Sequence, residues 1–388
     1  MSWGRFKLSK IANIIMGQSP ESKFFNFSGE GIPFMQGKTE FGEIYPTISK
    51  YTTKTTRIAS ENSILFTVRA PVGSLNIANQ EICIGRGLAA INSNDGNNSF
   101  LYYLLKNNTK ILLSQSGEGV YDSINKTNLL NVELFIPLQI EKRNKIGHIL
   151  SAYDDLIENN LKRIKLLEQA AQNIYKEWFI NMRFPGHENT PIDQETGLPD
   201  GWTFEKFSDI AGFSQGLQVP TNKQFAKKSK GQKRFIRIVD VTQGGQENRY
   251  VDCSNSKYEI EKKDLFMIRY GSPMVVMGYE GVIANNFFRI EILEDVKMKN
   301  NFLFSFLNRD SIKNLLMNYS SSATMPAISF KRISKMEILN PSFEVQKKFS
   351  DLYNYKFDLI QKLKSQNEKL KLARDILLPR LMNQTIEV

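Results

Sequence analysis

Few residues in this sequence have the types and spacing that catalytic sites need. Gly37-Lys38-Thr39 resembles the end of a phosphate-binding P-loop, but that motif requires a glycine at position 32, where the chain has isoleucine. The phosphate cradle depends on the length of that loop, so we expect no nucleotide site here. The two histidines, His148 and His187, and two separate cysteines provide little material for a zinc site or a histidine-based triad.

Motifs of DNA-cleaving and DNA-methylating enzymes are incomplete in the chain. Glu261-Lys262-Lys263 resembles the end of a nuclease motif, but acidic–x–lysine triplets are common in a chain with 51 lysines and arginines. The Asp/Asn-Pro-Pro-Tyr/Phe motif of adenine methyltransferases is absent, as is any Gly-x-Gly-x-x-Gly loop. We therefore expect no catalytic residue, no metal site and no cofactor held by this chain itself.

The composition is that of a globular protein with an excess of positive charge. The 388 residues are 41% hydrophobic and 11% aromatic, enough for two ordinary cores. No apolar run is long enough to span a membrane, the first residues contain no signal core, and Cys83 and Cys253 cannot form a disulfide framework, so we expect a cytoplasmic protein. The net charge of +11 favours a polyanionic partner such as nucleic acid, although solubility alone is an alternative explanation.

One sequence pattern occurs twice, about two hundred residues apart, as expected for a duplicated domain. The shared order and near-constant offset of the matches predict two pseudo-symmetric halves. The matching segments are Phe6–Ala12 with Phe204–Ala211, Gly17–Pro20 with Gly216–Pro220, Ile64–Arg69 with Asp264–Arg269, Phe100–Leu105 with Phe302–Leu307, and Val132–Pro137 with Met336–Pro341.

Each half changes from a β-rich to a helical pattern after its closing proline. The predicted organisation is a β-rich domain at 1–140, a central helix at 141–181, a linker and second β-rich domain at 182–343, and a C-terminal helix at 344–388. Pro379 is expected to bend or shorten the second helix. The fold class is therefore α+β, with two pseudo-symmetric domains joined by two long helices.

Both helices carry an apolar seam at alternating spacings of three and four residues, which is typical of a coiled coil. Antiparallel pairing about a common midpoint places Asn160 opposite Asn367, where the two amides can satisfy each other. Layers that pair Tyr153 with Arg374 fit less well, and we expect them to lie partly in water. Two separate amphipathic helices are the alternative. The predicted helix-pair core is Ile157, Asn160, Ile164, Leu167, Ile360, Leu363, Asn367 and Leu370.

The end of the first helix and the linker resemble the specificity subunits of type I restriction–modification systems. Residues 166–179 read LLEQAAQNIYKEWF, followed by FPGHE at 184–188 and LPDGW at 198–202. The resemblance covers the full length, as target-recognition domain, helix, second target-recognition domain and helix. It implies a non-catalytic subunit that reads a bipartite, asymmetric site in double-stranded DNA.

The same resemblance implies which partners supply the chemistry. The helices would dock two methyltransferase subunits, which bind S-adenosylmethionine, and two restriction subunits would join them to form an ATP- and Mg-dependent endonuclease. A stand-alone restriction or modification enzyme and a coiled-coil adaptor with no DNA role are the alternatives. Steeply salt-dependent DNA binding would exclude the adaptor.

Residues in the loops of the two recognition domains are the candidates for DNA contact, through phosphates or base edges. Arg69 and Arg269 fall at matching places in the repeat, and Arg86 falls near Asn285. The candidates are Gln36, Lys38, Arg69, Arg86 and Tyr121 in the first domain, and Lys223, Lys230, Lys233, Arg237, Arg269, Tyr279 and Asn285 in the second.

Overall fold

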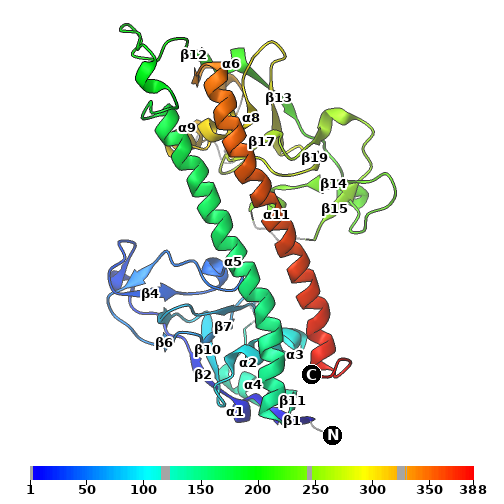
Figure 1. Ribbon diagram of the computed structural model, residues 1–388. Coiled ribbons are helices and arrows are strands. Elements are labelled where there is room, and N and C mark those ends of the chain that lie inside the picture. The colour runs from blue at the N-terminus through cyan, green and yellow to red at the C-terminus, as the bar shows by residue number, and fades with distance from the viewer. Residues whose placement is uncertain (1–2, 115–122, 243–246, 321–327, 329) are drawn as a thin grey trace. The chain divides into compact units, whose positions relative to one another are not determined.

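The structure is a computed structural model, in which residues 3–114, 123–242, 247–320, 328 and 330–388 are described. The chain forms two compact units (Figure 1). Unit 1 contains Met1–Arg163 and Leu363–Val388, and unit 2 contains Ile164–Lys362. Two 40-residue helices, α5 (Ile140–Phe179) and α11 (Phe343–Met382), each contribute residues to both units, and Pro379 lies inside α11.

The described residues of unit 1 form three sheets and four short α-helices. The strand orders are β1-β11, β2-β10-β7-β8 and β3-β5-β4-β9-β6. The strands are β1 (Trp3–Lys7), β2 (Ala12–Met16), β3 (Phe25–Asn26), β4 (Ile32–Met35), β5 (Tyr51–Thr52), β6 (Ile58–Ala59), β7 (Ile64–Thr67), β8 (Leu75–Ile77), β9 (Ile82–Ile84), β10 (Leu88–Ser93) and β11 (Glu133–Pro137). The helices are α1 (Leu8–Ile11), α2 (Asn98–Asn107), α3 (Thr109–Leu113) and α4 (Lys126–Asn131).

Unit 2 repeats this arrangement, with strand orders β12-β21, β13-β20-β17-β18 and β15-β14-β19-β16. The strands are β12 (Thr203–Lys206), β13 (Ala211–Gln215), β14 (Lys233–Ile236), β15 (Arg249–Val251), β16 (Glu259–Ile260), β17 (Leu265–Ile268), β18 (Val275–Val276), β19 (Gly281–Ile283), β20 (Phe287–Ile292) and β21 (Glu337–Asn340). The helices are α6 (Phe207–Ile210), α7 (Ile238–Thr242), α8 (Asn300–Leu307), α9 (Asp310–Ser320) and α10 (Phe330–Ile333). The predicted duplication and α+β class are confirmed.

Backbone hydrogen bonds identify which residues of the two units are equivalent. Gly17 N donates to Leu88 O at 2.9 Å in unit 1, and Gly216 N donates to Phe287 O at 3.1 Å in unit 2. In both units a glycine therefore ends the first strand of the second sheet, where the chain passes close to the neighbouring strand.

One match from the sequence is wrong by a single residue. Val68 N donates to Gly87 O, and Arg269 N donates to Asn286 O in the same position of the other unit. Arg269 is therefore equivalent to Val68, and Arg69 is equivalent to Tyr270. The two arginines align only in the sequence comparison. In the structure β7 begins at Ile64 and β17 at Leu265, so the numbering offset between equivalent residues is already one residue larger at these strands.

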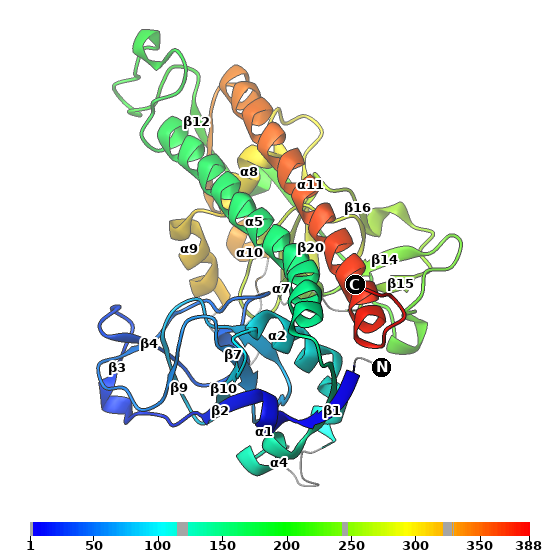
Figure 2. The same ribbon diagram turned by 60° about the horizontal axis from the view of Figure 1, so that its bottom comes forward.

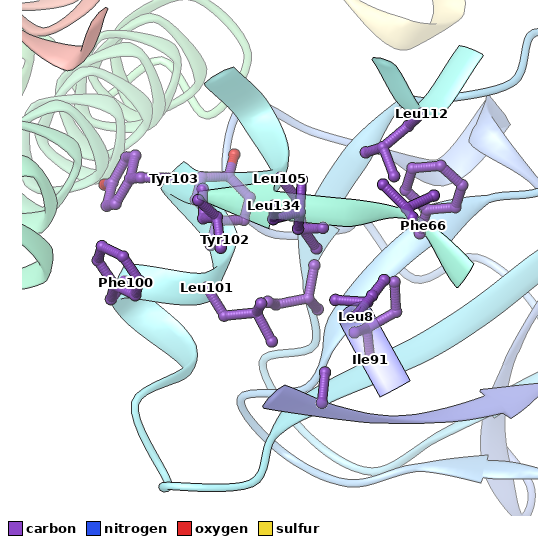
Figure 3. Close-up of a cluster of buried hydrophobic side chains, with 14 of the residues drawn as sticks. Leu8, Phe66, Ile91, Phe100, Leu101, Tyr102, Tyr103, Leu105, Leu112 and Leu134 are labelled. Carbon is purple, nitrogen blue, oxygen red and sulfur yellow. The ribbon is translucent and has the colours of Figure 1, made fainter. Parts of the chain in front are cut away.

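The core of unit 1 is an apolar cluster around α2 (Figure 3). Side chains Phe100 to Leu105 are all buried, and they pack with Leu8, Phe66 and Ile91 from the sheets. Ile146 and Leu150 of α5 join the cluster, as do Leu378, Leu381 and Met382 of α11. The last part of α11 thus lies beside the first part of α5 and completes this core (Figures 1 and 2).

The core of unit 2 is more aromatic. Phe179 packs against Phe302, Phe349 and Trp202, with ring centroids 4.8, 5.2 and 5.8 Å away. Here the second part of α5 meets the first part of α11, and Trp178 lies 6.2 Å from Phe349 between ring centroids. Each unit therefore contains one segment of each long helix.

The predicted contact between Asn160 and Asn367 is present in unit 1. Asn160 Nδ2 donates to Asn367 Oδ1 at 2.8 Å, and Asn367 Nδ2 donates to the backbone oxygen of Ile157 at 3.4 Å. Both asparagines are buried, and Ile157 is fully buried. Among the other predicted helix-pair residues Ile164, Ile360 and Leu363 are buried, while Leu167 and Leu370 are half-buried.

The expectation that the helix-pair layer of Arg374 lies partly in water is wrong. The Arg374 guanidinium forms an ion pair with Asp154, and both side chains are only 4% exposed. Tyr103 donates its hydroxyl to the other carboxylate oxygen of Asp154 at 2.6 Å. Burial, together with the neighbouring Asp154 charge, raises the pKa of Tyr103 well above its usual range. A buried polar network of three side chains therefore joins the last part of α11 to the rest of unit 1.

Candidate nucleic-acid interface

The ends of several strands meet at one place in unit 1, called the junction below. They bring predicted DNA-contact residues together there. Gly85 N donates to Met35 O at 2.7 Å, and Val68 N donates to Gly87 O at 2.9 Å. These bonds place Gln36, Arg69 and Arg86 next to one another in the fold, although they are far apart in the sequence. All three side chains are exposed, as is that of Lys38 in the following 3-10 turn.

Three glycines allow this close approach. A Cβ atom on Gly17 would lie 2.2 Å from the backbone oxygen of Gly85, and one on Gly87 would lie 2.2 Å from that of Gln36. A Cβ on Gly85 would lie 3.2 Å from the Gln36 Cα. Because real Cβ atoms do not come within 2.2 Å of a backbone oxygen, Gly17 and Gly87 require glycine, whereas a Cβ on Gly85 would require a small shift of its neighbours. The loops that carry Gln36 and Arg86 therefore stay in contact.

Unit 2 forms the same junction with different side chains. Ala284 N donates to Ile236 O at 3.0 Å, which is the counterpart of the bond between Gly85 and Met35. Arg237 is therefore equivalent to Gln36, and Asn285 is equivalent to Arg86, as the sequence indicated for the second pair. One unit presents an amide and a guanidinium at the two positions, and the other presents a guanidinium and an amide.

The guanidinium of Arg237 is already bound within unit 2. Its Nε donates to Asp240 Oδ2 at 3.0 Å, and its Nη2 donates to Asp240 Oδ1 and to Glu247 O, both at 2.8 Å. Asp240 is buried, so this arginine compensates a buried carboxylate. Tyr279 also contacts this place, donating its hydroxyl to the Asp240 backbone oxygen at 3.3 Å.

The other predicted residues of unit 2 lie in different surroundings. Lys223 and Lys230 are exposed, whereas Lys233 forms an ion pair with Glu259. The Arg269 guanidinium lies 4.9 Å from the Tyr270 ring centroid and 5.1 Å from that of Phe288. Its Nε is buried and has no hydrogen-bond partner in the described part of the chain. Tyr121 lies outside the described residues.

An aromatic and basic cluster in unit 1 was missed by the sequence argument. The Lys50 Nζ lies 5.5 Å from the Phe25 ring centroid and 5.8 Å from that of Phe27, which is 76% exposed. The Lys54 Nζ lies 5.2 Å from the Phe24 ring centroid. Cationic and aromatic groups together suit the phosphates and bases of nucleic acid. The run of phenylalanines at 24–27 was the available signal, but its lysine partners are distant in sequence.

The described residues contain no group of three or more His, Cys, Asp and Glu side chains that could hold a metal ion. In the same part of the chain, no helix is both long enough and apolar enough to cross a membrane. The two junctions carry hydrogen-bonding and cationic side chains on the same duplicated backbone arrangement.

The family model described as type I restriction modification DNA specificity domain matches residues 2–169 and 199–371. The two matches cover most of the chain and correspond to its two repeats. This chain belongs to that family. Its duplicated units are thus two copies of the specificity domain, and its membership agrees with the resemblance drawn from the linker.

Two relatives of this specificity protein come from Methanocaldococcus jannaschii. The type I restriction enzyme MjaIX specificity subunit is 28% identical over 98% of this chain and 92% of the relative. The putative type I restriction enzyme MjaX specificity subunit is 42% identical, but over 42% of this chain and 39% of the relative. The chain thus spans well under half of one relative and nearly all of the other.

A solved structure shares the fold. The S subunit of a type I restriction-modification system from M. genitalium matches with a TM-score of 0.60 over 98% of this chain and 96% of that one, at 16% identity. At that identity the match concerns the fold alone.

Proposed function

We propose that this specificity protein reads a bipartite, asymmetric site in double-stranded DNA, one half with each unit. The observation that carries the proposal is the pair of equivalent junctions with different side chains, Gln36 and Arg86 in unit 1 against Arg237 and Asn285 in unit 2. A shared scaffold with changed hydrogen-bonding groups is what two readers of different sequences require. The net charge of +11 supports a nucleic-acid partner.

The side-chain types suit base reading in the major groove. Arginine can bind the O6 and N7 atoms of guanine, and glutamine or asparagine can bind the N6 and N7 atoms of adenine. Arg86 and Gln36 are exposed and adjacent, so they are the strongest candidates in unit 1. Lys38, Lys223 and Lys230 are exposed lysines suited to phosphates. Because the Arg237 guanidinium binds Asp240, this arginine stabilises the junction more than it reads bases.

The proposed partners are two methyltransferase subunits and two restriction subunits, which would bind S-adenosylmethionine, ATP and Mg. The chain itself is proposed to be non-catalytic. Exposed apolar side chains on the long helices support a docking role in each unit. Unit 1 exposes Leu156 and Leu372, 53% and 62%, and unit 2 exposes Leu166 and Tyr355, 65% and 74%. Because contiguous exposed apolar patches mark protein interfaces, these side chains are candidates for the docking surface.

The test is to express the chain with the methyltransferase subunit of its own system and to map methylated adenines across a host genome. We expect a motif with two short specified halves and a constant unspecified gap. Methylation without a split motif, or none despite a stable complex, would favour the adaptor. Binding of the same complex to DNA should also weaken steeply as salt is raised.

Single substitutions should separate the two halves of the site. We expect Arg86→Ala to relax the specificity of one half only, and Asn285→Ala to relax the other, each by about 1–3 kcal/mol of discrimination. Lys223→Ala is the matched control, because loss of a phosphate contact weakens binding to all sequences and lowers the salt slope by about 1. Binding to oligonucleotides with one half-site changed measures both effects. Equal loss on all sequences for Arg86→Ala would contradict a reading role.

A further inference from the structure

The duplication creates an ambiguity about which helix segment completes unit 1. Helices α5 and α11 have 40 residues each, so every residue of α11 has a counterpart in α5, from Ile140 with Phe343 to Phe179 with Met382. The core of unit 1 is completed by Leu378, Leu381 and Met382. Their counterparts in α5 are Tyr175, Trp178 and Phe179, which are also large and mainly apolar. Apolar burial alone therefore provides little to reject the α5 segment of a second copy.

Three polar contacts distinguish the two segments. Asn367 accepts a hydrogen bond from Asn160, Lys371 Nζ lies 2.7 Å from Glu43 Oε2, and Arg374 pairs with Asp154. All three join the last part of α11 to other residues of unit 1. The counterparts of these α11 residues in α5 are Ile164, Glu168 and Ala171.

None of the α5 counterparts can make these contacts. Isoleucine would leave the Asn160 amide buried without its partner, and glutamate would bring a second negative charge to Glu43. Alanine would leave Asp154 buried with no cation. An uncompensated buried charge is strongly disfavoured, and a single buried asparagine pair is known to select helix register and partner. The contact between Lys371 and Glu43 is about one-third exposed and contributes less.

The opposite exchange is disfavoured for the same reason. In unit 2 the counterpart of Asp154 is Phe357, which is 6% exposed. If the last part of a second copy's α11 packed there, Arg374 would face a phenylalanine ring, lose the buried Asp154 carboxylate and keep only the exposed Asp375 beside it on α11. Both homotypic pairings, α5 with α5 and α11 with α11, therefore bury Asp154 or Arg374 without its partner on the other helix.

We infer that Asn367, Lys371 and Arg374 act as a pairing code that makes unit 1 accept the last part of α11 and reject the equivalent segment of α5 from a second copy. The code leaves pairing within one chain favoured, because the two segments share a chain and so a high effective concentration. It also ensures that paired helix segments join one unit of each kind, not the same unit from two copies. That this yields a DNA site with two different halves rests on the proposed function.

The test changes the charges of the pair formed by Asp154 and Arg374 in two full-length copies that carry different affinity tags. One copy carries Asp154→Arg and the other Arg374→Asp, so each alone places like charges together in unit 1. When the copies exchange their last helix segments, both unit 1 sites regain an opposite-charge pair. We expect equimolar co-purification after co-expression, at least about tenfold above that of two wild-type copies, since 1.4 kcal/mol is already tenfold.

Matched controls separate pairing from general loss of stability. Asp154→Arg with Arg374→Asp in the same chain should return to the monomer and to near the wild-type thermal midpoint. Asp310→Lys in one copy and Lys313→Asp in the other change an exposed pair in unit 2, and these copies should not co-purify. Co-purification of the first two copies at no more than the wild-type level would overturn the inference.

A second variant tests rejection of the α5 segment directly. Asn367→Ile, Lys371→Glu and Arg374→Ala together give α11 the residues of α5 at the three positions. With the code removed, we expect a concentration-dependent rise in chain exchange and in dimer by light scattering. A strictly monomeric variant with an unchanged thermal midpoint would overturn the inferred pairing code. Absence of a split methylation motif for the wild-type protein would instead contradict only the proposed function.

Discussion

Replacing Arg374 by methionine is expected to destabilise unit 1 by about 3–5 kcal/mol, the largest effect we anticipate for a single side chain. The substitution keeps much of the side-chain volume but leaves the Asp154 carboxylate, which is 4% exposed, without its cation. Tyr103 would remain as its hydrogen-bond donor and would compensate only part of the loss. Urea-induced unfolding of the full chain measures the change as a lower midpoint.

The matched variant removes the whole polar network. Arg374→Met combined with Asp154→Leu and Tyr103→Phe leaves no buried charge or hydroxyl without a partner, so we expect most of the lost stability to return. Lys313→Met, which breaks an exposed ion pair, should change stability by less than about 0.5 kcal/mol. An unchanged midpoint for Arg374→Met alone would mean that water replaces the guanidinium.

Alanine at Gly17 or Gly216 is expected to destabilise the corresponding unit by about 3 kcal/mol, through overpacking. The new Cβ would lie 2.2 Å from the backbone oxygen of Gly85 in unit 1 and of Ala284 in unit 2. A neighbouring backbone cannot turn aside as a flexible side chain can, so the strand junction must open. Unfolding curves for the two variants should each show one destabilised transition.

Each unit also contains a control glycine for this prediction. Gly37 and Gly212 have open space where a Cβ would be built, and neither has a positive φ. Alanine there should be neutral or stabilise slightly, by limiting the unfolded chain. If Gly17→Ala behaves like Gly37→Ala, then the close approach of the strands is not required in solution. Weaker DNA discrimination by a folded Gly17→Ala variant would link the junction to base reading.

The sequence by itself determined the duplication, the class of each segment and the midpoint of the helix pair. Repeated apolar runs such as Ile64–Thr67 and Leu265–Ile268 record burial directly, since both strands are fully buried. Heptad spacing likewise records which face of a helix is buried, which is why Asn160 could be matched with Asn367.

Only the tertiary structure decided which polar groups meet. Asp154 lies outside the apolar seam, and its partners Tyr103 and Arg374 come from distant elements, so no local pattern marks the network. The adjacency of Gln36 and Arg86, and the equivalence of Arg269 with Val68, likewise follow from hydrogen bonds between strands far apart in the chain. Local periodicity indicates whether each residue is buried, and burial is a property of one residue at a time. A polar contact depends on two positions that only the folded chain brings together.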